Sequence, residues 1–355
     1  MQNLTNKFTS ISFRLFSMLD IILSVVWSFL IAIFAIPSII DVSGKKRLFD
    51  QPNHRTVHER LTPRLGGLAI FAGFMSAVTI FGDMTGGVQQ LLAGCLIMFF
   101  IGVKDDIISV SAFKKFFVQV LAAGIVMFIG QVRISNFQGL MGIYELEMGI
   151  SYGFTFLVII GITNAINLID GIDGLAGSII LIISLTFGIY FYYYDVPYSY
   201  VAFSLAGAVI GFLRYNIYKA KIFMGDTGSL LCGFIISVMA IEFIEMNSVG
   251  AAPAIAVGIL IIPIFDTVRV FSIRIISGLS PFHPDKNHIH HKLLSFDLSH
   301  LSVVLALILL NVVTIVAMLF YSHLGNTKLL IIVVITGLTI SIMLGMFKKK
   351  HVLKH

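Results

Sequence analysis

The chain has 355 residues, 57% of them hydrophobic and 12% charged, with a formal net charge of +6. Together with a mean hydropathy of +0.97, this composition excludes a water-soluble globular protein and predicts one polytopic membrane domain over residues 1–355. The positive charge suits the anionic inner leaflet of a membrane and requires no nucleic-acid partner.

Apolar segments alternate with short polar gaps along the chain. A transmembrane helix needs roughly 20 apolar residues, so we expect an all-α integral membrane protein, a polytopic bundle of about eleven transmembrane helices. The expected helices lie at 19–43, 66–82, 88–103, 112–130, 151–168, 174–193, 197–213, 227–246, 250–276, 299–322 and 327–347. Between the fourth and the fifth, Val132, Ile134, Tyr144 and Leu146 surround glycines and predict a small external β-hairpin within 131–149.

Basic residues predict the orientation of this bundle. If the N-terminus is outside, 20 of the 24 Lys and Arg residues lie in the inner gaps and the C-terminal tail. The positive-inside rule then makes these gaps and the C-terminus cytoplasmic. The polar motifs fall in the same gaps, so we expect a single active site, built from loops at the cytoplasmic face.

The first inner gap, residues 45–67, is a basic loop broken by prolines. It is either a charged membrane anchor or an anion site for a phosphate-bearing substrate, with His58 and Arg64 as donors. The second gap has adjacent carboxylates, Asp105 and Asp106, which either pair with lysines at a solvated helix end or handle Mg²⁺ and phosphate, one of them serving as a base. The lysines near this pair are Lys104, Lys114 and Lys115. Of these, Lys114 and Lys115 are candidate substrate contacts.

The third gap reads NAINLIDGIDGLAG over residues 164–177. Its polar residues recur every third position, so on a helix they share roughly one face, yet glycines interrupt the helix at the carboxylates. This pattern predicts a ligand-binding break that lines an aqueous cavity, the alternative being polar groups that join helices to one another. The polar residues are Asn164, Asn167, Asp170 and Asp173.

The fourth gap, residues 214–230, ends in MGDTGSL. Asp226 either caps the eighth helix or, at a helix start that attracts anions, ligates a cation that bridges to phosphate. Phe223 either packs at the membrane boundary or stacks on a planar base.

The fifth gap, residues 280–294, contains four histidines and Lys286. Zinc is the first alternative, but no Cys lies nearby and the H-x-H-H spacing does not fit structural zinc sites. Contacts of the imidazoles and of Lys286 with a pyrophosphate are the favoured interpretation. Upstream, Asp266 and Arg269 lie three residues apart, which predicts a local ion pair.

Taken together, these motifs resemble the polyprenyl-phosphate N-acetylhexosamine-1-phosphate transferase superfamily, and within it the bacterial WecA and TagO type. The matching strings are TPRLGG (62–67), the Asp pair (105–106), NAINLIDGIDGLAG (164–177), FLRYN (212–216), IFMGDTGSL (222–230) and SPFHPDKNHIHH (280–291). The resemblance implies Mg²⁺-dependent transfer of N-acetylglucosamine 1-phosphate from UDP-GlcNAc to undecaprenyl phosphate with release of UMP, at the start of O-antigen, common-antigen or teichoic acid synthesis. It also implies a location in the bacterial cytoplasmic (inner) membrane.

The resemblance further implies individual roles. Asp226 is the principal Mg²⁺ ligand and Asn167 adds an amide oxygen, with Mn²⁺ as a candidate substitute for Mg²⁺. Asp105 and Asp106 deprotonate the lipid phosphate or assist the metal. Catalytic histidines at the pyrophosphate are His290 and His291. The candidate substrate-binding residues, from the gaps and the resemblance together, are His58, Arg64, Lys114, Lys115, Asp170, Asp173, Asn216, Phe223, Lys286 and His288.

Alternatives remain at the level of the substrate and of the protein class. Another UDP-N-acetyl sugar fits the same chemistry, although Arg64-Leu65 and the HIHH string (288–291) disfavour the peptidoglycan branch, which transfers phospho-N-acetylmuramoyl-pentapeptide. A transporter is disfavoured because its polar groups would lie near the bilayer midplane between repeats. The external hairpin and the outer helix faces are candidate surfaces for a homodimer.

Overall fold

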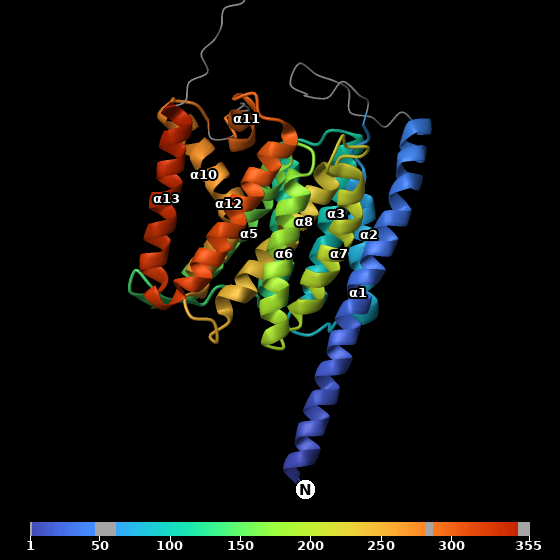
Figure 1. The fold of residues 1–355 in the computed structure, drawn as a ribbon, viewed down its shortest axis with the longest axis vertical. Helices are drawn as coiled ribbons and strands as arrows, with labels where there is room; N and C mark the ends of the chain where they lie inside the picture. The colour runs from blue at the N-terminus through green and yellow to red at the C-terminus, as the bar shows by residue number, and fades with distance from the viewer. Residues whose placement is uncertain (1, 47–61, 281–286, 347–355) are drawn as a thin grey trace, which may run out of the picture.

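The computed structural model describes residues 2–46, 62–280 and 287–346 of the chain. It is an almost entirely helical bundle in which long helices run roughly side by side (Figure 1). The helices are α1 Gln2–Lys46, α2 Gly66–Phe81, α3 Val88–Ile107, α4 Ala112–Gly124, α5 Met148–Ile169, α6 Leu175–Tyr193, α7 Tyr198–Asn216, α8 Gly225–Glu245, α9 Ala252–Ile259, α10 Ile261–Ile276, α11 Ile289–Leu294, α12 His300–Phe320 and α13 Asn326–Met346. A π-helical turn, Ile125–Ile129, extends α4, and a short 3₁₀ turn, Ser322–Leu324, precedes α13.

The fold class predicted from the sequence is confirmed. Each of the predicted apolar segments coincides with a helix, or in one case with the pair α9 and α10, which are bent by 79° against each other. Among the described residues, seven helices are long and apolar enough to cross a membrane, or eight if the bent pair is one broken span. Membrane crossing by the remaining helices α2, α3 and α7 stays a prediction.

Helix α8 lies at the centre of the bundle. It packs against α2, α3, α5, α6 and α9, and nearly all of its apolar length is buried. Gly102 allows α3 to approach it closely, because a Cβ at that position would collide with the backbone of Thr227. The close approach matters for the site, since the C-terminal turn of α3 and the first turn of α8 both carry carboxylates.

The predicted hairpin is present as β1 Asn136–Leu140 and β2 Ile143–Glu145, which pair antiparallel. Its boundaries are narrower than predicted, since Val132 and Ile134 precede β1 as buried core residues. Glu245, at the end of α8, accepts hydrogen bonds from the Ser135 amide at 2.7 Å and its hydroxyl at 2.6 Å. The hairpin therefore lies at the opposite end of the bundle from α11 (Figure 1).

Candidate active site

The site is built around the first turn of α8, and a carboxylate from α3 determines how that helix begins. Asp106 accepts hydrogen bonds from the backbone amides of Asp226 at 2.8 Å and Thr227 at 2.9 Å, and a short one from the Thr227 hydroxyl. These amides are among the donors that a helix start leaves unsatisfied. The alternative in which Asp226 caps α8 is therefore wrong, because Asp106 supplies the capping oxygens and Asp226 lies inside the first turn.

Asp226 is thereby presented to Asp105 and Lys115. The Lys115 Nζ lies 2.8 Å from Asp226 Oδ2 and 3.0 Å from Asp105 Oδ2, so one ammonium bridges two carboxylates. The other oxygen of Asp105 accepts the Val110 amide at 2.6 Å. All three side chains retain partial exposure, between 15% and 27%. The cluster is therefore open to a solute from one side.

Asn167, on the last turn of α5, completes this cluster. Its amide nitrogen donates to the Ser229 hydroxyl at 2.8 Å and makes a longer contact of 3.3 Å with Asp226 Oδ1. Residues 164 and 167 lie on α5. This helix ends at Ile169 and α6 begins at Leu175, so the predicted interruption of the helix is present at residues 170–174. The Asn167 amide thus lies beside Asp226, the carboxylate with which the family resemblance pairs it.

Negative charge concentrates in the break between α5 and α6. Burial, together with the nearby charges of Asp226 and Asp106, raises the pKa of Asp170 to about 7, and the Arg64 charge opposes this rise. Burial also raises the pKa of Asp106, to about 6, against the hydrogen bonds that favour its ionised form. Crowded carboxylates of this kind favour a cation. The location and charge fit a site that binds a positively charged ion together with phosphates.

Asp173 and Asn216 stabilise the loops around the cluster. Asp173 accepts the Ala220 amide at 2.9 Å. Asn216 accepts the Gly174 amide at 2.9 Å and donates to the Ile222 carbonyl at 2.9 Å. These contacts bind the α5–α6 break to the loop that leads to α8, so the structure gives both side chains a role in loop geometry.

Two motifs that are distant in sequence are paired through their backbones. The Phe223 amide donates to the Pro63 carbonyl at 2.8 Å, and the amide of Gly66 donates back to the Phe223 carbonyl at 2.9 Å. Phe223 is half-buried and Arg64 is exposed beside this pairing. The TPRLGG and IFMGD strings therefore form one wall of the site.

The histidine segment contacts the break between α5 and α6. The imidazole of His290 packs on Gly171, where any Cβ would collide with its Nε2 atom. Only 2% of His290 is exposed, and within the described residues its Nε2 has no hydrogen-bond partner. Burial and the neighbouring His291, whose ring centroid lies 4.3 Å away, lower the pKa of His290 to about 3, so this imidazole is neutral.

The structure does not join every predicted residue to the cluster. Lys114 is exposed and makes no hydrogen bond or ion pair with the described residues. His58 and Lys286 lie outside the described residues. Asp266 and Arg269 both contact residues 287–289, a connection that the spacing of the two residues does not predict. Buried charges inside an apolar segment were the signal for it.

The described residues contain no group of three or more Asp, Glu, His or Cys side chains arranged as a metal cage. Mg²⁺ does not need one, because it is usually held by one or two carboxylates together with substrate phosphates and water. Asp226 and Asp105 supply two carboxylates that already share one cation, the Lys115 ammonium. Their oxygen chemistry fits Mg²⁺.

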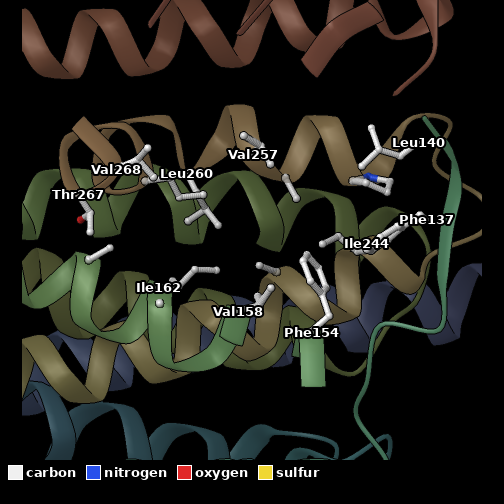
Figure 2. A pocket seen from close by; sticks show the side chains of 16 residues that line it. Phe137, Leu140, Phe154, Val158, Ile162, Ile244, Val257, Leu260, Thr267 and Val268 are labelled. Atoms are coloured by element: carbon white, nitrogen blue, oxygen red, sulfur yellow. The ribbon is translucent and has the colours of Figure 1, made fainter. Parts of the chain in front are cut away.

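An apolar pocket of ≈ 320 Å³ lies between α5, α9, α10 and the end of α8 (Figure 2). Phe137 and Leu140 of the hairpin bound one end, and Thr267 and Val268 of α10 bound the other. Helices α5 and α10 therefore contribute to this pocket and, through Asn167 and Asp266, also to the polar end of the bundle.

Comparison with known proteins identifies the family to which this chain is similar. Residues 88–244 match the model of the glycosyl transferase family 4. A probable undecaprenyl-phosphate N-acetylglucosaminyl 1-phosphate transferase of Bacillus subtilis (strain 168) is 35% identical over 303 residues, 83% of each chain. An undecaprenyl-phosphate alpha-N-acetylglucosaminyl 1-phosphate transferase of Escherichia coli (strain K12) is 29% identical over 256 residues, 70% of each chain.

A decaprenyl-phosphate N-acetylglucosaminephosphotransferase of Mycobacterium tuberculosis (strain ATCC 25618 / H37Rv) is 35% identical over 293 residues, 73% of this chain and 72% of the relative. The chain therefore belongs to glycosyl transferase family 4, and it is a multi-pass membrane enzyme of the phosphotransferase class. This establishes the family resemblance found in the sequence.

Proposed function

We propose that this protein transfers N-acetylglucosamine 1-phosphate from UDP-GlcNAc to undecaprenyl phosphate. An oxygen of the lipid phosphate attacks the phosphorus that carries the sugar, the bond from that phosphorus to the uridine-side phosphate oxygen breaks, and UMP leaves. The products are undecaprenyl-pyrophosphoryl-GlcNAc and UMP. The observation that carries the proposal is the convergence of Asp105, Lys115, Asn167 and Asp226 at the start of α8 in a chain of this family.

In this proposal Asp226 and Asn167 hold Mg²⁺, with Asp105 next to them. When bound, the ion neutralises charge on the transferring phosphates, which supplies much of the catalysis of phosphoryl transfer. Asp106 fixes the backbone from which Asp226 projects. With the ion held by Asp226 and Asn167, the Lys115 ammonium, which bridges Asp105 and Asp226 in this structure, would be available to contact substrate phosphate.

A side chain of the protein also accepts the proton of the lipid phosphate. A phosphate monoester is already an anion at neutral pH, so direct attack needs positioning more than a covalent intermediate. Burial raises the pKa of Asp105, and this carboxylate is therefore suited to take up the remaining proton. We accordingly propose direct attack, with Asp105 as the base.

The acceptor explains the apolar pocket. An isoprenoid chain requires an apolar surface, and the pocket of Figure 2 is lined by side chains such as Phe154, Val158 and Leu260. It borders α10, whose Asp266 contacts the histidine segment. We propose that part of the polyprenyl chain lies in this pocket while its phosphate reaches the carboxylate cluster.

The distribution of Lys and Arg supports an orientation with the cluster in the cytoplasm, where nucleotide sugars are found. We therefore propose a location in the bacterial cytoplasmic membrane, with the product entering O-antigen, common-antigen or teichoic acid synthesis.

The experiment that tests the reaction uses purified protein in detergent with undecaprenyl phosphate, Mg²⁺ and a panel of UDP-sugars, with UMP release as the readout. We expect release with UDP-GlcNAc and none with UDP-MurNAc-pentapeptide, because a pocket shaped around a compact sugar leaves polar groups of the peptide arm unpaired. Comparable rates with both donors would contradict the choice of sugar and leave the transfer chemistry intact. Lack of release with every donor would contradict the proposal itself.

A further inference from the structure

One turn of α10 contacts three consecutive residues that precede the catalytic histidines. Asp266 Oδ2 lies 2.9 Å from His288 Nδ1, and Asp266 Oδ1 accepts the Ile289 amide at 2.7 Å. Arg269, one helical turn further, donates from Nη1 to the Asn287 carbonyl at 2.7 Å. Two side chains of one helix face thus bind the backbone and one ring of the segment 287–289, which we call the histidine clamp.

The three side chains of the histidine clamp are buried. Asp266 is 2% exposed, Arg269 is 6% exposed and His288 is 6% exposed. A buried charge is strongly destabilising when its partner is removed. The folded state therefore depends on the contacts that Asp266 and Arg269 make with the histidine segment. A bare helix-to-loop connection would not require two charged residues in the apolar interior of α10.

The clamp determines where His290 lies. His290 follows Ile289 by one residue in α11, and its ring is stacked with that of His288 at a centroid distance of 5.7 Å and an angle of 16°. On the other side its imidazole meets Gly171, between Asp170 and Asp173. The order of contacts therefore runs from Asp266 to His288, from His288 to His290, and from His290 to the α5–α6 break.

We propose that Asp266 and Arg269 are positioning residues for phosphoryl transfer, which fix His288 and, through it, hold His290 against the Asp170–Gly171 turn. His288 is then an anchor of the site, and His290 is the member of the pair that faces the reaction. The role of these residues in catalysis rests on the proposed function. The contacts of the clamp are independent of that function.

The kinetic test compares Asp266→Asn, His290→Ala and the double variant. Asp266→Asn keeps the shape of the side chain and removes its charge, so the imidazole is retained but loosely placed. We expect kcat to fall roughly 10- to 100-fold, as for a misplaced catalytic group, while KM for the UDP-sugar changes by less than about twofold. In the double variant we expect no loss beyond that of His290→Ala, because both act through one group. Multiplicative losses would overturn the proposal.

A second measurement needs no activity, so it separates failure of the clamp from failure of the proposed function. Diethyl pyrocarbonate is applied to the full-length protein in detergent, and carbethoxylation of His290 is followed by mass spectrometry. We expect His290 to be protected in the wild type and in Arg269→Lys, which keeps a donor for the Asn287 carbonyl. In Asp266→Asn and Arg269→Gln its modification rate should rise at least about fivefold, since local opening governs access.

Ser272→Ala is the matched control, because Ser272 lies on α10, is exposed and bonds only to the Val268 carbonyl within the described residues. It should leave both kcat and the protection of His290 at the wild-type level. Each variant is taken as folded when it shows a cooperative thermal unfolding transition. Unchanged protection of His290 in folded Asp266→Asn and Arg269→Gln would overturn the clamp.

Discussion

At the scale of single residues, we expect substitution of Asp226 to have the largest effect on activity. It lies in the first turn of α8, beside Asn167 and bridged to Asp105 through Lys115. Asp226→Asn removes the charge and keeps the volume, so the helix should still form because Asp106 provides its capping oxygens. We expect the rate of UMP release to fall roughly 100- to 1,000-fold, a loss of several kcal/mol of transition-state stabilisation.

The control for this substitution is Asp83→Asn, an exposed aspartate whose carboxylate accepts only the Thr85 amide within the described residues. It should retain the wild-type rate. A folded Asp226→Asn enzyme that releases UMP at a near-normal rate and ordinary Mg²⁺ concentration would remove Asp226 from the metal site.

Lys115 offers a second prediction at this scale. Its ammonium occupies the space between two carboxylates, so it competes with a divalent cation for them. We expect Lys115→Met to bind Mn²⁺ about tenfold more tightly, a change of roughly 1.4 kcal/mol, as measured by electron paramagnetic resonance without substrate. Turnover should fall, because the contact with substrate phosphate is lost.

Lys114→Met is the matched comparison for Lys115→Met. Lys114 lies next to Lys115 on α4, is exposed, and belongs to no ion pair of the described residues. It should leave Mn²⁺ affinity unchanged. Weaker Mn²⁺ binding by Lys115→Met would show that the lysine supports the cation instead of competing with it.

At the scale of elements, the approach of α3 to α8 decides whether Asp106 reaches the start of α8. Gly102→Ala places a methyl group against the Thr227 backbone, so α3 has to move outward. Small misplacements of catalytic geometry are expensive, up to roughly 100-fold per ångström. We expect at least a tenfold loss of turnover, read as UMP release per folded protein.

Gly153→Ala is the control for this helix contact, because a Cβ at Gly153 on α5 meets no atom within 4 Å. An alanine there should leave turnover unchanged and is favoured in a helix by roughly 0.5–1 kcal/mol. Equal activity of the two variants would mean that the α3–α8 contact does not set the geometry of the carboxylates.

At the scale of the whole molecule, the distribution of Lys and Arg predicts the orientation of the bundle in the membrane. Helix α11 lies at one end of the bundle and the hairpin at the other (Figure 1), and His290 of α11 contacts Gly171, next to Asp170. In a background without Cys95 and Cys232, both buried, Ser109→Cys and Ser295→Cys should be shielded from an impermeant thiol reagent in intact cells. Tyr144→Cys on the hairpin, 65% exposed, should react. Labelling of Ser295→Cys from outside would invert the predicted topology.

Much of this architecture follows from the sequence because its signals are local. Apolar length predicted helices, and glycines between alternating apolar residues predicted the hairpin, whose strands nevertheless begin later than expected because Val132 and Ile134 are buried in the core. The family also follows from the sequence, since the motifs come in the family's order and span most of the chain.

The partners of the individual side chains were decided only by the tertiary structure. The sequence marked Asp105, Asp106, Asn167 and Asp226 as one group, but it did not show that Asp106 begins α8 or that Lys115 bridges two carboxylates. It likewise paired Asp266 with Arg269 and did not show that both contact residues 287–289. Hydropathy and spacing describe neighbours along one helix, and these contacts join helices whose relative depth and rotation are set by packing across the whole bundle.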